Sequence, residues 1–179
     1  LIMYIFKIFL TCIITSIAFT QDPELLLEKG QNELASGYLS ESEQTFQKAL
    51  QIDPSFAPAL QALSKLSLYK GDISKAVDYS NQAVQADEDF REWAIEINKI
   101  KEEMQLGVGK VGQGLFEEAI SIFNSILQTH PYFPGSEYYM GATRLRQKDL
   151  EKAAKHFSNA LKIYPDHIKA NKGLERITK

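Results

Sequence analysis

Cysteine is nearly absent from this sequence, because its 179 residues contain a single one, Cys12. One cysteine cannot form an internal disulfide, so small folds that depend on a disulfide framework are excluded. Glycine is also scarce, at ten residues, which excludes a collagen-like repeat. Positive charge is not in excess, since 20 Lys and Arg stand against 23 Asp and Glu. The chain lacks the basic surface that contact with a phosphate backbone requires, and we predict no nucleic-acid partner.

Patterns that carry catalysis or bind cofactors are lacking as well. The three histidines, His130, His156 and His167, are isolated, and none has a second ligand at metal-site spacing. Residues 107–112 read GVGKVG and match the GxGxxG string, but they fall late in an expected helix and do not follow a strand. No nucleophile with a local base signature is present. We therefore predict no metal, no cofactor and no enzymatic activity.

The longest apolar run lies at the N-terminal end of the sequence. Residues 1–20 contain fifteen apolar residues and one charge, Lys7. A basic start, an apolar run over 8–19 and small residues at its end are typical of a secretory signal sequence, whose cleavage would leave Gln21 first. The alternative is an uncleaved anchor over 3–19, because the run is close to the length that spans a membrane. We expect an exported protein of the periplasm or cell envelope, or one anchored to the inner membrane.

A motif of 20 residues recurs through the rest of the chain. GYLSESEQTFQKALQIDPSF (37–56) returns after 34 residues as GDISKAVDYSNQAVQADEDF (71–90). GLFEEAISIFNSILQTHPYF (114–133) returns after 34 residues as KDLEKAAKHFSNALKIYPDH (148–167). Before each copy lies another helical pattern with a small residue at a fixed place, namely Gly30, Ser64, Gly107 and Gly141. Such a period predicts an array of helix pairs, because one pair cannot bury its apolar stripe alone.

These four copies resemble the tetratricopeptide repeat, a helix-turn-helix unit of 34 residues. In that family, small residues lie where the two helices cross, an aromatic residue follows in the second helix, and a proline follows the helix. The small second-helix residues here are Ser42, Ala76, Ala119 and Ala153. The aromatic position, four residues later, is occupied by Phe46, Ser80, Phe123 and Phe157. The position of the proline is occupied by Pro54, Glu88, Pro131 and Pro165. The second copy therefore departs from the family pattern at two positions, Ser80 and Glu88. The resemblance implies an all-α fold, a right-handed α-solenoid of antiparallel helix pairs.

The register of the copies predicts one repeat domain over residues 21–179. Its four repeats are expected at 23–56, 57–90, 100–133 and 134–167, and are called repeats one to four below. Between repeats two and three lie nine extra residues, 91–99, without glycine or proline, and we expect them to lengthen the first helix of repeat three. Residues 168–179 are expected to form a capping helix, with Ile168, Leu174 and Ile177 facing repeat four.

One apolar stripe runs through the insertion into repeat three. Its members, Phe90, Trp93, Ile97, Ile100 and Met104, are spaced by three and four residues, as on one face of a helix. One interpretation is that the stripe packs on the second helix of repeat two. The other is that Trp93 anchors a partner or a second copy of the chain. The sequence leaves both open.

The family resemblance also implies a partner-binding face, because ligands in that family usually lie along the concave surface of the first helices. Carried over to this chain, that face comprises Leu27, Gln31, Gln61, Lys65, Tyr69, Lys101, Met104, Tyr138 and Arg146. Aromatic and apolar side chains beside a few cations suit a peptide segment. We expect an exported protein-interaction module that presents a concave groove to a polypeptide partner in cell-envelope assembly or secretion. The alternative is a membrane-tethered or self-associating scaffold that uses the N-terminal segment and the Trp93 helix.

Overall fold

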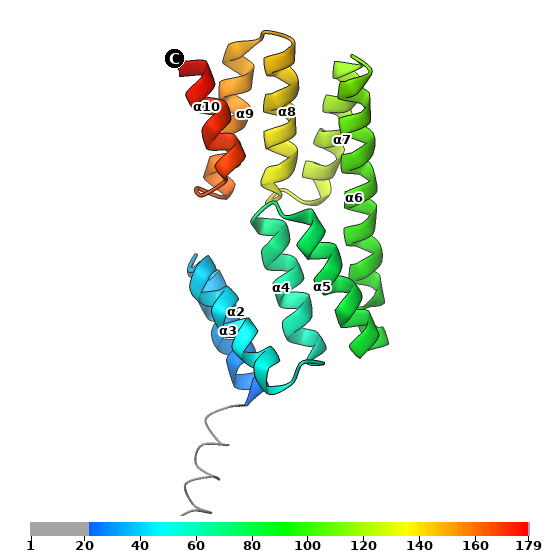
Figure 1. Cartoon of the computed structure of the whole chain (residues 1–179), viewed down its shortest axis with the longest axis vertical. Helices are drawn as coiled ribbons and strands as arrows, with labels where there is room; N and C mark the ends of the chain where they lie inside the picture. Colours follow the sequence, from blue (N-terminus) through cyan, green and yellow to red (C-terminus); the bar gives the residue numbers. More distant parts are fainter. Residues whose placement is uncertain (1–21, 179) are drawn as a thin grey trace, which may run out of the picture.

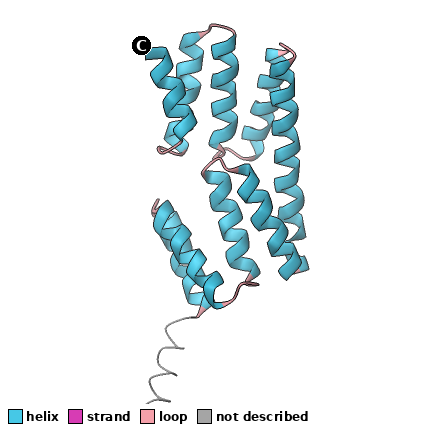
Figure 2. Cartoon of the chain, viewed as in Figure 1, coloured by secondary structure: helices cyan, strands magenta, loops and turns pink. Residues whose placement is uncertain are grey.

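The computed structural model describes residues 22–178, and in that range the chain forms nine α-helices and one short 3-10 helix, with no strand (Figures 1 and 2). The helices are α2 (Pro23–Ala35), α3 (Leu39–Ile52), α4 (Ala57–Tyr69), α5 (Ile73–Ala86), η1 (Glu88–Phe90), α6 (Arg91–Gly112), α7 (Phe116–Thr129), α8 (Pro134–Arg146), α9 (Leu150–Ile163) and α10 (Ile168–Thr178). The predicted all-α helical-repeat fold is confirmed. The segment predicted as a signal or anchor, 1–20, lies outside the described residues.

Caps and turn residues fix the ends of the helices. Asp72 and Asp149 precede α5 and α9, and each side chain accepts a backbone N–H three residues on, at 3.1 and 3.2 Å. These bonds satisfy amides that the first helical turn leaves without a partner. The turns inside the pairs need a left-handed residue, which is Gly37, Gly71 and Gly114 in three repeats and Lys148, at φ 63°, in repeat four.

The two helices of a pair cross where the sequence places its smallest residues. A Cβ atom on Gly30 or Gly107 would overlap the ring of Phe46 or Phe123, respectively, and the same holds for Gly141 against Phe157. The three rings are buried. In repeat two the crossing is built from Ser64 and Ser80, and the Ser64 hydroxyl donates to the carbonyl oxygen of Ala76 at 2.6 Å. The predicted close crossings are therefore present, with a serine variant in repeat two.

Helix α6 determines how the two halves of the molecule, repeats one and two and repeats three and four, are placed. It contains the insertion and runs unbroken for 22 residues, about 33 Å. Ile97 and Ile100 pack in one core with Ala76 and Val77 of α5 and with residues of α7 and α8. In Figure 1, α5 lies beside the lower half of α6 with α4 on its far side, and α7 lies beside the upper half with α8 on its far side. Repeats three and four consequently sit above repeat two along the axis of this helix.

The apolar stripe of α6 lies mostly inside the molecule. Ile97, Ile100 and Met104 are buried, while Phe90 and Trp93 are half-buried. The interpretation that the stripe packs on repeat two therefore holds for Ile97 and Ile100. One face of the Trp93 ring also lines a surface pocket. Two sets of side chains pack separately, one around Phe46 in repeat one and one around Phe157 at the C-terminal end.

In the C-terminal helix, the prediction that Ile168 faces repeat four is wrong. Leu174 and Ile177 pack against the Phe157 cluster as predicted, but Ile168 is 69% exposed. Ile168 is the first residue of α10 and lies ahead of the turn that reaches Phe157. The fully buried positions of α10 are the small residues Ala170 and Gly173, since a larger residue at 173 would overlap the Phe157 ring.

Candidate functional site

Three chain turns meet in the middle of the molecule because α6 offsets the two halves (Figure 1). A Cβ atom on Gly71, in the turn from α4 to α5, would lie 3.2 Å from Nε2 of His167 and 3.5 Å from Cγ of Pro134. The rings of Tyr69 and Tyr132 have centroids 5.9 Å apart. These contacts join repeat two to the segments that precede α8 and α10. Two hollows flank the junction, and the buried ring of Phe133 lines both.

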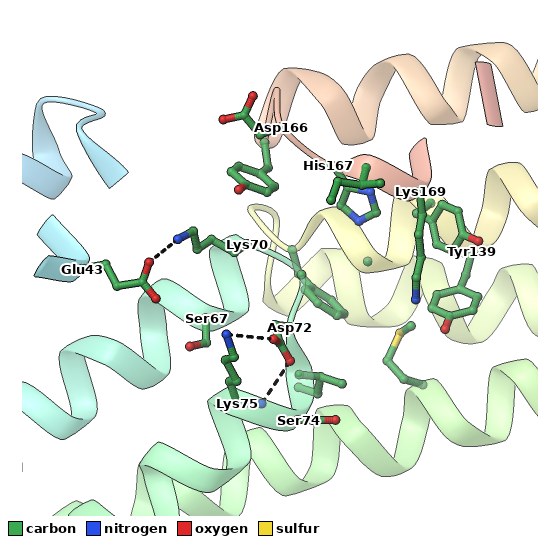
Figure 3. Close-up of a pocket in the computed structure, with 18 residues that line it drawn as sticks. Glu43, Ser67, Lys70, Asp72, Ser74, Lys75, Tyr139, Asp166, His167 and Lys169 are labelled. Carbon is green, nitrogen blue, oxygen red and sulfur yellow. Dashed lines mark hydrogen bonds and ion pairs between the residues drawn. The ribbon is translucent and has the colours of Figure 1, made fainter. Parts of the chain in front are cut away.

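The larger hollow, called the central cleft here, has a volume of about 690 Å³. It is bordered by α3, the α4–α5 turn, α6, α8 and the α9–α10 turn, so repeats one to four and the C-terminal helix all contribute (Figure 3). Its tyrosines are Tyr138, Tyr139 and Tyr164, and the Phe133 ring also lines it. Its titratable and charged residues are Glu43, Lys70, Asp72, Lys75, Asp166, His167 and Lys169. The cleft therefore offers tyrosine faces beside charges of both signs.

Most of the lysines in the central cleft are held by neighbouring carboxylates. Nζ of Lys70 lies 2.5 Å from Oε2 of Glu43, and Nζ of Lys75 lies 3.8 Å from Oδ2 of Asp72 (Figure 3). Lys169 differs, because its Nζ lies 6.0 Å from the centroid of the Tyr138 ring and pairs with no carboxylate within residues 22–178. Lys169 is thus a cation of the cleft that remains available to an acidic group of a ligand.

His167 is both a helix cap and part of the cleft wall. It precedes α10, and its Nδ1 accepts the backbone N–H of Ala170 at 3.1 Å. The ring is buried and lies 5.4 Å from the centroid of Tyr138. Burial lowers the pKa of His167 below its ordinary value, and the charge of Lys169 acts in the same direction. Burial also raises the pKa of the Tyr138 hydroxyl, and Tyr139 adds to that shift.

The smaller hollow, called the aromatic pocket here, has a volume of about 280 Å³. It is defined by Lys65, Tyr69, Trp93, Pro131 and Tyr132. The indole N–H of Trp93 donates to the Ser64 hydroxyl at 2.9 Å, which fixes the ring against α4. Nζ of Lys65 lies 5.3 Å from the centroid of the Trp93 ring, within the range of a cation–π contact. A tryptophan and two tyrosines therefore surround a mainly apolar space with one lysine at its edge.

The residues predicted for a concave face occupy different surroundings. Met104 and Tyr138 line the central cleft, although Met104 is only 5% exposed and belongs to its floor. Lys65 and Tyr69 line the aromatic pocket together with Trp93. These five residues are the part of the prediction that the structure gathers around the central junction.

The remaining predicted residues lie away from both hollows. Leu27 packs against the cluster around Phe46, and Gln31 is exposed on the same helix. Gln61 and Lys101 are half-buried. Arg146 is exposed and donates from Nη1 to the carbonyl oxygen of Val111 at 3.4 Å, which ties the end of α8 to α6.

Sequence reasoning missed the cleft residues that come from turns. Lys70, Asp72, His167 and Lys169 lie between helices or at helix ends, outside the first-helix positions that the repeat pattern highlights. Nothing in the repeat register marks them, since a turn residue becomes a site residue only when the other half of the molecule meets it. Tyr132 offered a weak signal, because it is an aromatic residue that the repeat pattern does not explain.

Within residues 22–178, no group of three His, Cys, Asp or Glu side chains lies close enough to hold a metal ion. In the same range, no helix combines the length and the apolar character needed to cross a membrane. His156 contacts Glu137 instead of a metal partner, with Nδ1 and Oε2 2.7 Å apart.

Comparison with known proteins identifies the repeat. Models of the tetratricopeptide repeat match residues 23–56, 57–90 and 136–167, together more than half of the chain. The first two matches have the same bounds as predicted repeats one and two. No curated protein matches the chain in sequence.

Solved structures of other proteins were compared with the chain, and one of them supports the fold. The tetratricopeptide-repeat domain of P58(IPK) is 15% identical and superimposes with a TM-score of 0.54, covering 87% of this chain and 54% of that one. YrrB, described as a tetratricopeptide-repeat protein with an unusual peptide-binding site, is 21% identical with a TM-score of 0.42, covering 87% of this chain and 93% of its own. The pilF protein of Pseudomonas aeruginosa is 19% identical with a TM-score of 0.40, covering 87% and 67%. At these identities the likeness concerns the fold alone.

Proposed function

The chain belongs to the tetratricopeptide-repeat family, and we propose that its central cleft binds an extended segment of a partner polypeptide. Members of this family are protein-interaction modules, and the function therefore resides in the surface that the repeats present. The observation that carries the proposal is the convergence of all four repeats and α10 on one hollow of about 690 Å³. Its tyrosines provide contact area and its charges provide orientation, which is the combination that peptide recognition uses.

Charge in the cleft favours a partner segment that carries an acidic side chain. Lys70 and Lys75 are paired with carboxylates of the chain itself, whereas Lys169 rests on the Tyr138 ring without a carboxylate partner within residues 22–178. A carboxylate of the partner can pair with Lys169 while the partner backbone crosses the tyrosines. The exposed position of Lys169 leaves it open to this contact.

A charge reversal at the cleft tests the proposal. A partner would be identified by photo-crosslinking to the full chain, and its affinity would then be measured with purified proteins. Lys169→Glu is expected to weaken binding about tenfold or more, because an attraction becomes a repulsion. Lys172→Glu is the matched control, since Lys172 is an exposed lysine of the same helix that does not line the cleft. Equal affinity of both variants and the wild type would remove the central cleft from the binding site.

We further propose that the protein is exported and acts in cell-envelope assembly or secretion. The support is the composition of residues 1–20, fifteen of which are apolar. Expression of the full sequence followed by mass spectrometry of the N-terminus tests this directly. A chain that starts at Gln21 in the exported fraction supports a free module of the periplasm. A retained segment 3–19 in the membrane fraction supports the tethered alternative.

The self-associating scaffold is the second candidate function, and one observation favours it. Ile95 and Leu106 of α6 are 63% and 55% exposed and lie eleven residues apart, about three helical turns, on one face. Two exposed apolar side chains on one face of a long helix can pack against a second copy. Sedimentation analysis of the wild type and of the Ile95→Lys, Leu106→Lys double variant tests this candidate. A monomeric wild type rejects it, and a dimer that the variant abolishes supports it.

A further inference from the structure

The aromatic pocket has features of a preformed binding site for a single side chain. Its volume of about 280 Å³ exceeds the roughly 150 Å³ of an apolar cavity that is known to hold a benzene ring. The Trp93 ring is held in place by its hydrogen bond to Ser64, and the Tyr69 ring is supported by Tyr132 at 5.9 Å. The pocket walls therefore require little ordering when a ring enters, which reduces the entropic cost of binding.

The charges around the pocket indicate what lies next to that side chain in the ligand. Nζ of Lys65 is held over the Trp93 ring, and within residues 22–178 Lys65 pairs with no carboxylate. His130, the other residue of the wall that can carry a positive charge, already contacts Glu96, with Nε2 and Oε1 3.4 Å apart. The pocket therefore presents one available charge, and it is positive. A negative group on the ligand complements it.

We propose that the aromatic pocket binds one aromatic side chain of the partner polypeptide and that Lys65 pairs with a carboxylate adjacent to that side chain. The proposal rests on the proposed peptide-binding function and adds a sequence preference to it. The ring of the ligand packs among Trp93, Tyr69 and Tyr132, whose faces and edges favour aromatic contacts at centroid distances of about 4.5–7 Å. The adjacent acidic residue remains at the surface, where Lys65 reaches it.

The chain contains one tryptophan, so its fluorescence under selective excitation reports on this pocket alone. The probe is the peptide acetyl-Asp-Phe-Asp-amide, titrated into the full chain. Acetyl-Asn-Phe-Asn-amide lacks the charge, and acetyl-Asp-Ala-Asp-amide and acetyl-Asp-Leu-Asp-amide lack the ring. We expect a saturable change in Trp93 emission with the first peptide and about two- to fivefold weaker binding of the Asn peptide, as for one exposed ion pair. The Ala peptide is expected to give no saturable change, and the Leu peptide to bind more weakly than the Phe peptide.

Two variants with matched controls assign the effect to the pocket. Lys65→Gln is expected to abolish the difference between the Asp-Phe-Asp and Asn-Phe-Asn peptides, whereas Lys48→Gln, an exposed lysine of α3, leaves it unchanged. Tyr132→Ala is expected to weaken binding of both Phe peptides, while Tyr38→Ala has no effect. Tyr132 and Tyr38 are 64% and 59% exposed, so neither substitution empties the core.

Three results would overturn the proposal. The first is an unchanged Trp93 emission with every peptide, and the second is equal binding of the Asp and Asn peptides, or of the Phe and Leu peptides. The third is a dimer in sedimentation experiments that Tyr132→Ala dissociates, because the occupant is then a second copy of the chain. If the peptides do not bind but Lys169→Glu still weakens binding of the identified partner, the proposed function stands while this inference fails. If Lys169→Glu has no effect but the peptides bind, the inference survives without the central cleft.

Discussion

At the scale of single residues, three of the helix pairs depend on a crossing position without a side chain. Gly107 of α6 lies against the ring of Phe123, and that ring is fully buried with no room to withdraw. Interiors are packed to near-crystalline density, so one additional methyl group must displace a neighbour. The same string GVGKVG contains Gly109, where an added methyl group would meet no neighbouring helix among residues 22–178 within 4 Å. The two glycines therefore have different physical roles within one helical turn.

Gly107→Ala is expected to lower the free energy of unfolding by about 1–3 kcal/mol, because overpacking against Phe123 exceeds the gain in helix propensity. Gly109→Ala is the matched control and is expected to raise the free energy of unfolding by up to about 1 kcal/mol. Urea denaturation followed by circular dichroism measures both. Changes of the same sign in the two variants would contradict the crossing described for repeat three.

The buried histidine makes stability depend on pH. The pKa of His167 is lowered in the folded chain, mainly by burial, so the unfolded chain takes up a proton first as the pH falls. The contribution of His167 to the free energy of unfolding is therefore constant above the ordinary histidine pKa of about 6.5 and decreases below it, until the folded pKa is reached. His167→Asn keeps a side-chain cap for α10 but cannot titrate. The variant is expected to lose this part of the pH dependence.

Urea titrations of the wild type and His167→Asn at neutral and mildly acidic pH give the comparison. His130 and His156 are present in both proteins, so the difference isolates His167. The wild type is expected to lose more stability than the variant on acidification. An identical loss in both proteins would show that His167 keeps an ordinary pKa in the folded chain.

At the scale of the helices, the repeat pattern predicts most of the structure because it encodes local rules. Small residues at fixed places predict the crossings, and Gly37, Gly71 and Gly114 predict turns that need a left-handed residue. Repeat two shows how a departure is accommodated, since Ser64 and Ser80 replace the glycine and phenylalanine, and Trp93 of α6 donates to Ser64. That contact joins residues 29 positions apart, and no local pattern predicts it.

The C-terminal helix also shows that a local sequence pattern does not predict which side chains reach the core. Ile168, Leu174 and Ile177 look equivalent in the sequence, yet Ile168 lies before the turn that reaches Phe157 and is exposed.

Leu174→Ala is expected to lower the free energy of unfolding by about 1–2 kcal/mol, less than for a fully buried leucine because the side chain is half-buried. Ile168→Ala is expected to change it by less than about 0.5 kcal/mol. Thermal denaturation of both variants measures the difference, and equal losses would contradict the orientation of α10.

At the scale of the whole molecule, the length of one helix creates the candidate sites. Helix α6 is long enough for α5 of repeat two to pack along its first half and for α7 of repeat three to pack along its second half (Figure 1). The α4–α5 turn therefore meets the segments before α8 and α10, and both hollows lie at this meeting. The sequence indicated a longer helix at 91–99, but the placement of repeats along it depends on contacts between turns. For this reason Tyr138, Lys65 and Tyr69 were predicted on one face, while their partners Lys169 and Tyr132 were not.

The most direct test of this arrangement is a set of nuclear Overhauser contacts across the junction in the labelled full chain. We expect cross-peaks between the rings of Tyr69 and Tyr132, whose centroids are 5.9 Å apart, and between Gly71 and the His167 ring. The rings of Tyr138 and Tyr139, 5.0 Å apart within α8, serve as the internal standard. If the standard is observed while both junction contacts are missing, the two halves do not meet as described, and neither the central cleft nor the aromatic pocket exists in solution.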